Sequence, residues 1–166
     1  MPRTLVQAFA FLLGLWIALS LSPFGARASA DPDLTYLEAD LYDQVNAVRI
    51  ERHLMPLSRS RQLDAVARGH SLDMARRAYV AHESPEGANA IHRLESAQVE
   101  GFSLAAENIG ATNRAGPNRE IVTSWLASPI HRTNLLAPAF NATGIGIARA
   151  PDGTLIYTQL YVTYPR

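Results

Sequence analysis

The sequence predicts an α+β domain in which helices cover an antiparallel sheet, and two observations predict it. Apolar residues recur at helical spacing in several segments of the chain. Near the end, residues 143–150 and 154–163 are strand-like runs joined by the turn sequence Pro151-Asp152-Gly153, which is typical of a hairpin. An antiparallel hairpin combined with amphipathic helices favours a layered α+β fold.

The first elements along the chain are two helices. Apolar spacing predicts a helix over residues 35–53, which ends before Pro56 because the residue preceding a proline disfavours helix. Ser60 can cap a second helix that ends near Tyr79. Residues 81–87 are rich in turn formers and have no periodicity, so we expect a loop there.

The middle of the chain alternates between helix and strand. We expect a short helix over residues 89–97, a strand over 102–111 and then a loop over 112–118. A third helix has an apolar face that includes Trp125 and stops at Pro129. Another helical turn can follow before the hairpin, which gives the order helix, helix, strand, helix, strand, strand.

The first thirty residues have the features of a secretory signal peptide. Arg3 precedes an apolar stretch over residues 5–21, and the small residues Ala28-Ser29-Ala30 follow. Cleavage after Ala30 leaves residues 31–166, enough for one domain, and predicts a secreted or periplasmic protein with no stable membrane span. The alternative is an uncleaved anchor helix, for which the apolar stretch is short.

Charge and cysteine content argue against several functional classes. Without Arg3 and Arg27 the chain keeps 13 of its 15 basic residues against 15 acidic ones, a net charge of −2, which disfavours a nucleic-acid binder. The chain has no cysteine, which excludes a disulfide framework, a thiol nucleophile and a thiolate metal site. A serine hydrolase is disfavoured because the sequence has no G-x-S-x-G elbow.

Three residues form a candidate metal site. His82 and His131 lie in irregular segments near prolines, and Glu107 interrupts an apolar strand among small neighbours. Two imidazoles and one carboxylate are the ligand set of a catalytic-type zinc centre, which leaves one coordination position for water. The alternative is that they are unrelated surface and loop residues, because separations of 25 and 24 residues do not by themselves bring them together.

The other three histidines carry weaker signals. His70 lies on the apolar face of the second helix, so we expect a core residue that makes one hydrogen bond. His53 ends a helix and His92 lies in a weak one, and neither position points to a function.

Several short segments carry a resemblance to a known family: residues 45–49, 55–57, 67–75, 82–87, 106–110, 125–136 and 144–146. In this order they resemble the CAP superfamily of cysteine-rich secretory, antigen five and pathogenesis-related proteins, in its cysteine-free bacterial SCP-like branch. The likeness spans about residues 41–163. It implies a three-layer α-β-α sandwich with a central antiparallel sheet.

The resemblance also implies a cleft lined by two histidines and two acidic residues, which in some members binds a divalent metal such as Zn²⁺. His82 matches the first histidine, Glu107 the first acid and His131 the second histidine. Ser128 stands at the position of the second acid, and Ala106 at that of a glycine that usually precedes the first. Three of the four cleft groups are therefore present, which suffices for a His-His-Glu metal site completed by water.

Two functions from different classes follow from these expectations. Proteins similar in this way are mostly secreted binding or signalling modules, some of which take lipids. We therefore expect a non-catalytic extracytoplasmic binding module whose partner is a lipid or a cell-envelope component. The alternative is a metal-dependent hydrolase acting on peptide or cell-envelope material, with Glu83 or Glu86 as its base. A purely structural domain is a third interpretation.

Overall fold

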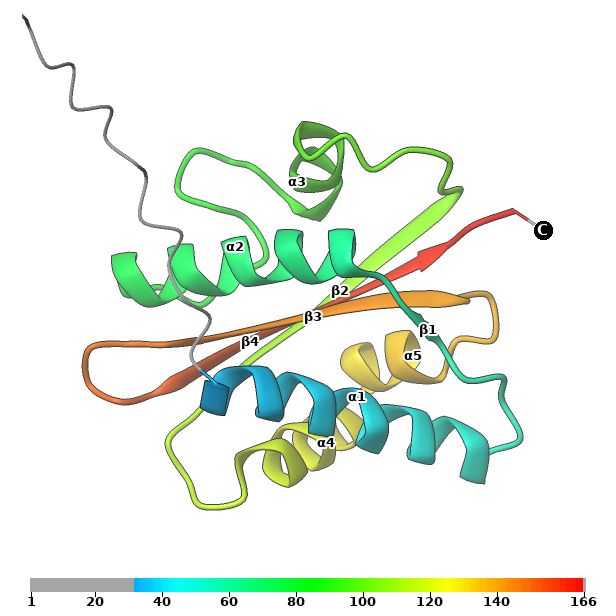
Figure 1. Cartoon of the computed structure of the whole chain (residues 1–166), viewed down its shortest axis with the longest axis horizontal. Coiled ribbons are helices and arrows are strands. Elements are labelled where there is room, and N and C mark those ends of the chain that lie inside the picture. Colours follow the sequence, from blue (N-terminus) through cyan, green and yellow to red (C-terminus); the bar gives the residue numbers. More distant parts are fainter. Residues whose placement is uncertain (1–31, 166) are drawn as a thin grey trace, which may run out of the picture.

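Helices lie on both sides of a four-stranded sheet in the computed structural model, which describes residues 32–165 (Figure 1). The predicted signal peptide, residues 1–30, lies outside the described residues. The elements are α1 (Pro32–Glu51), β1 (Ser58–Arg59), α2 (Arg61–Arg77), α3 (Ala90–Ser96), β2 (Leu104–Thr112), α4 (Pro117–Ala127), α5 (Pro129–Leu136), β3 (Ala142–Arg149) and β4 (Leu155–Thr163). None of the described helices is long and apolar enough to cross a bilayer.

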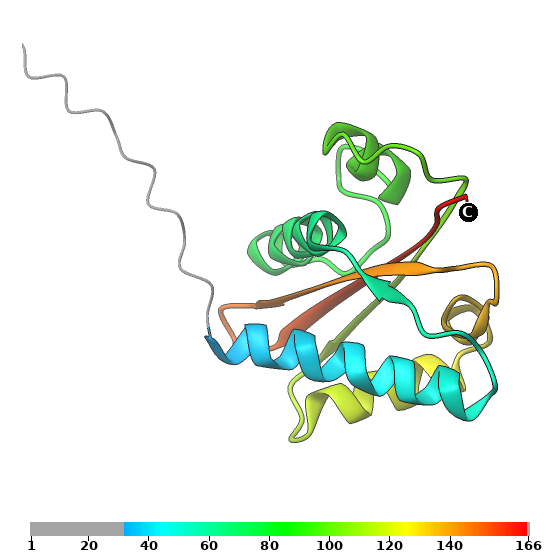
Figure 2. The same cartoon turned by 45° about the vertical axis from the view of Figure 1, so that its right-hand side comes forward.

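The predicted three-layer α-β-α sandwich is confirmed. In both views α2 and α3 cover one face of the sheet, and α1, α4 and α5 cover the other (Figures 1 and 2). The strand order is β1-β3-β4-β2, and β4 pairs antiparallel with both β3 and β2, so the predicted hairpin and central antiparallel sheet are confirmed. The two-residue β1, which the sequence analysis did not predict, adds parallel to β3 at one edge.

The ends of the helices follow local sequence signals. Ser60 caps α2 by accepting the Leu63 N–H, and Ala78 ends the helix in the left-handed conformation, one residue before the predicted end. Proline occupies the first turn of α4 and of α5. As a result α4 begins at Pro117, inside the segment predicted to be a loop.

Two glycines allow the backbone of α2 to lie directly against β3. A Cβ atom on Gly146 would stand 2.0 Å from the Arg68 nitrogen, and one on Gly144 would stand 2.2 Å from the Leu63 carbonyl carbon. No side chain fits at either position. The packing of α2 on the sheet, and with it the start of the loop that follows α2, therefore depends on residues without a side chain.

The outer edge of β3 is closed by carboxylates where β1 ends. Asp64 accepts the Ile145 N–H at 2.8 Å, and Glu38 accepts the Ile147 N–H at 3.2 Å. Both carboxylates are buried and pair with arginines of α2 or of the segment before it. These side chains satisfy backbone donors that a neighbouring strand would otherwise take.

Candidate functional site

Glu107 lies near the middle of β2 and binds His82 and an arginine through its two carboxylate oxygens. Its Oε1 is 2.9 Å from His82 Nδ1, and its Oε2 accepts from Arg93 Nη2 at 2.7 Å. The carboxylate is almost fully buried, whereas half of the His82 side chain is exposed. The arrangement holds one side of the imidazole ring in place and leaves the other ring nitrogen, Nε2, free to bind a ligand.

Arg93 of α3 ties the loop after α2 to this carboxylate. Besides Glu107, its guanidinium donates to the carbonyl oxygens of Ala88, at 2.7 Å, and of His82, at 3.2 Å. One residue thus neutralises Glu107 and fixes both ends of the loop that carries His82. Arg93 was not predicted as a site residue, because a single arginine in a short helix is usually a solvated residue.

His70 is buried, as expected for a core residue, but it lies next to the site. Its Nε2 is 3.0 Å from the Ala81 carbonyl oxygen and 3.9 Å from Glu107 Oε1. Burial lowers the pKa of His70, and this effect exceeds the opposing one of the Glu107 charge. The histidine therefore anchors the residue that precedes His82.

His131 approaches from the opposite layer of the molecule. It lies in α5, and its ring centroid is 6.4 Å from that of His82, with the two planes tilted by 48°. The His131 carbonyl accepts from Asn108 Nδ2, which fixes the start of α5 against β2. Burial lowers the pKa of His131, and the neighbouring His82 contributes a smaller shift in the same direction. The structure thus brings the three predicted residues together beside β2.

The remaining predicted residues lie beside this arrangement. Ser128 joins α4 to α5, where its backbone N–H bonds the Ser124 carbonyl and its side chain does not cap α5. Glu86 pairs with Arg77 at 2.6 Å, and this hydrogen bond lowers the pKa of Glu86 to about 2, which leaves it a poor base near neutral pH. Glu83 is exposed.

The geometry gives Glu107 a different role from the direct metal ligand that its residue type suggested. Among residues 32–165, no group of three or more His, Asp or Glu side chains is arranged to hold a metal ion. Both oxygens of Glu107 are engaged, one of them by a cation. What remains is a pair of imidazoles, one of them oriented by a carboxylate. These residues fit a two-histidine site, with the remaining ligands supplied by water.

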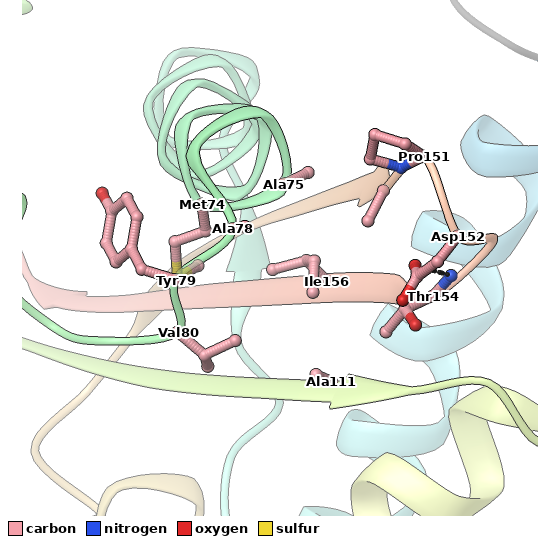
Figure 3. A pocket seen from close by; sticks show the side chains of 11 residues that line it. Met74, Ala75, Ala78, Tyr79, Val80, Ala111, Pro151, Asp152, Thr154 and Ile156 are labelled. Atoms are coloured by element: carbon pink, nitrogen blue, oxygen red, sulfur yellow. Dashed lines mark hydrogen bonds between the residues drawn. The ribbon is translucent and has the colours of Figure 1, made fainter.

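Two hollows in the described part of the chain are relevant to a ligand. One of about 330 Å³ adjoins the site and is lined by His82, Asn89, Ala90, Ile91, Ala105 and Glu107. A larger one of about 460 Å³ lies between the end of α2 and the β3–β4 turn (Figure 3). Its lining is mainly apolar, with Met74, Val80 and Ile156 in the middle and Asp152 at one end, and it contains none of the predicted cleft residues.

Comparisons with known proteins give a consistent result. Residues 42–161 match the family model of CAP, the cysteine-rich secretory protein family. The protein YkwD of Bacillus subtilis is 31% identical over 134 residues, which are 81% of this chain and 50% of that protein, so the chain spans about half the length of the curated relative it matches.

Solved structures agree with the family match. The crystal structure of an extracellular protein containing an SCP domain from Bacillus anthracis is 33% identical, with a TM-score of 0.68 over 81% of this chain and 44% of that one. An outer surface protein of Borrelia burgdorferi has a TM-score of 0.72 over 80% of this chain and 96% of that one. At 19% identity this second likeness concerns the fold alone.

Proposed function

This chain belongs to the bacterial branch of the cysteine-rich secretory protein (CAP) family, and on that premise we propose that it is a non-catalytic extracytoplasmic binding module whose His82–His131 pair takes a divalent metal ion such as Zn²⁺. The two imidazoles supply the protein ligands. Glu107 orients His82, and water completes the coordination.

The observation that carries this proposal is the bond between His82 and Glu107. A carboxylate that accepts from Nδ1 fixes the tautomer with its lone pair on Nε2, the form that ligates metals. The lowered pKa of His131 keeps that ring neutral near pH 7, so it too can donate a lone pair. Arg93 forms a salt bridge with this carboxylate.

Binding rather than catalysis is favoured by what surrounds the pair. Ser128 stands where the resemblance expects a second acid, and the salt bridge of Glu86 with Arg77 leaves that carboxylate a weak base. A lipid or another cell-envelope component is the partner we propose. The apolar hollow in Figure 3 is a place where an acyl chain would fit.

An extracytoplasmic location is supported by the predicted signal peptide and by the description of the Bacillus anthracis relative as extracellular. Mass spectrometry of the exported protein should show a chain that begins at Asp31. Recovery of the full-length chain in the membrane fraction would instead favour the uncleaved anchor.

Calorimetric titration with ZnCl₂ tests the metal site. We expect one ion per chain, at least tenfold weaker binding by His82→Ala and by His131→Ala, and a loss of about 10- to 100-fold in Glu107→Gln, because that variant loses the orienting charge. His53→Asn is the matched control, since His53 is an exposed histidine with a positive φ that asparagine tolerates.

Two outcomes would count against the proposal. Absence of zinc binding by the unaltered protein, or an equal loss in the His53→Asn control, would remove the metal site. Turnover of a peptide or cell-envelope substrate by the zinc-loaded protein, abolished in His82→Ala, would replace the binding module with the hydrolase.

A further inference from the structure

We propose that the outer edge of β2 is the docking site for an extended peptide, which adds to the sheet as a further strand and ends at the histidine pair. The proposal rests on the binding module described above and adds a peptide, bound beside the histidine pair, to the partners proposed there.

Alternate residues of β2 direct their backbone groups away from β4. In an antiparallel pair, each residue points its N–H and its C=O to the same side, and successive residues alternate. The carbonyls of Glu107 and Ile109 accept from the side chains of Asn134 and Trp125, which lie outside the ladder between β2 and β4. The odd-numbered residues from 105 to 111 therefore face the open side of the strand.

Part of that open side has no protein partner. The bonds from Asn134 Nδ2 to the Glu107 carbonyl and from Trp125 Nε1 to the Ile109 carbonyl close the middle of the edge. Within residues 32–165, neither the N–H nor the C=O of Ala105 has a hydrogen-bond partner on this side. The outer edge of β3 is different, because carboxylates occupy its backbone donors.

His82 and His131 lie at the end of the unpaired part of the β2 edge, next to Ala105. His82 comes from the layer of α2 and α3, and His131 from the layer of α5, with the sheet between them (Figure 1). Rings carried by layers on opposite faces of a sheet can come within 6.4 Å of each other only beyond the edge of the sheet, because elsewhere the strands separate the two layers. A strand added beside Ala105 would therefore lead its end to the two rings.

The surfaces on the two sides of this edge indicate which kinds of side chain such a peptide should carry. Successive residues of an added strand would point to opposite faces of the sheet. One face offers the 330 Å³ hollow with Ala90 and Ile91, and the other faces the layer of α5, where Ile130 is 75% exposed beside His131. Neighbouring apolar residues near one end of the peptide would fit both. Main-chain hydrogen bonds would supply affinity, as in β-strand addition generally.

The test uses a substitution that removes one outward N–H and leaves the ladder to β4 intact. Proline is tolerated in an edge strand where the N–H faces outward, so Ala105→Pro should fold. Ala111→Pro is the matched control, because it removes an outward N–H at the far end of the same strand. The probe is the peptide acetyl-Thr-Val-Ile-Val-Thr-amide, titrated into ¹⁵N-labelled protein.

We expect the peptide to slow amide exchange at Ala105 and Glu107, and to bind at least tenfold more weakly to Ala105→Pro than to Ala111→Pro. Equal affinity in the two variants would overturn the docking site. So would protection at Ala105 that rises with protein concentration and accompanies a dimer in sedimentation, because the edge would then pair with a second copy of this chain.

A zinc titration of the same samples separates the two proposals. Peptide-dependent protection at Ala105 in a protein that binds no zinc would uphold the docking site and remove the metal site. Zinc binding at the histidines without any effect of the peptide at Ala105 would do the reverse.

Discussion

Replacing Gly146 with alanine should destabilise the protein strongly, although it adds only one methyl group. Gly146 lies in β3 under the backbone of α2, and its carbonyl accepts from Ser71 Oγ at 2.9 Å. A methyl carbon there would stand 2.0 Å from the Arg68 nitrogen, where ordinary contact begins at 3.4 Å. The obstacle is helix backbone, which cannot rotate away as a side chain can.

The magnitude follows from the displacement that relieves this clash. To reach ordinary contact, α2 must retreat by about 1.4 Å, and a gap of about 0.5–1 Å already forfeits a quarter to a half of the dispersion energy across an interface. The bonds from Ser71 to Gly146 and to Thr158 would stretch beyond hydrogen-bond length. Overpacking and a strained buried hydroxyl together predict a loss of about 4 kcal/mol in the free energy of unfolding.

Gly69→Ala in the same helix gives the matched control with the opposite sign. A Cβ atom at Gly69 meets nothing within 4 Å, so this substitution should stabilise α2 by about 0.5–1 kcal/mol through helix propensity. Urea unfolding gives both free energies, and thermal unfolding should show a Tm lower by about 15 °C for Gly146→Ala. A loss below about 1 kcal/mol in Gly146→Ala would refute the close packing of α2 on β3.

Two further predictions concern the site. Arg93→Met should lower the free energy of unfolding by about 3 kcal/mol, because it leaves the buried Glu107 carboxylate without its cation. Arg77→Met breaks only an exposed ion pair and should change the urea unfolding curve little. Similar losses in the two variants would contradict this role of Arg93. Burial holds the pKa of His70 below its usual value. The imidazole therefore binds a proton at higher pH in the unfolded chain than in the folded protein. As a result, the free energy of unfolding should fall as the pH drops below about 6.5. His70→Gln, which keeps a donor for the Ala81 carbonyl, should flatten that part of the urea-midpoint profile, and an unchanged slope would assign it to another group.

The larger elements of the fold could be predicted because each has a repeating or local signal. The apolar periodicity of α1 and α2, the Ser60 cap and the turn between β3 and β4 all act over short stretches of chain. β1 has two residues, too few to show alternation, and it exists only because β3 lies beside it. Glu38 lies on α1 and was not singled out, yet it is buried against β3, a contact 109 residues away in sequence.

The sequence indicated three side chains that lie close together in the structure, and it did not indicate the contacts that they make. His82, Glu107 and His131 were chosen by residue type and by resemblance, and they lie together beside β2. The role of Glu107 could not be predicted, because it depends on Arg93, which lies 14 residues earlier on another element of the fold. Nor does the sequence show that the histidines come from opposite layers of the molecule.

The carboxylates that close the outer edge of β3 limit how this protein can self-associate. An incoming strand would have to displace Asp64 and Glu38 from backbone amides while their arginines remain paired to them. Growth of a continuous sheet requires two free edges per molecule, and here one is permanently capped. Any sheet-to-sheet pairing must therefore stop at two molecules, which protects a protein without disulfides from forming fibres.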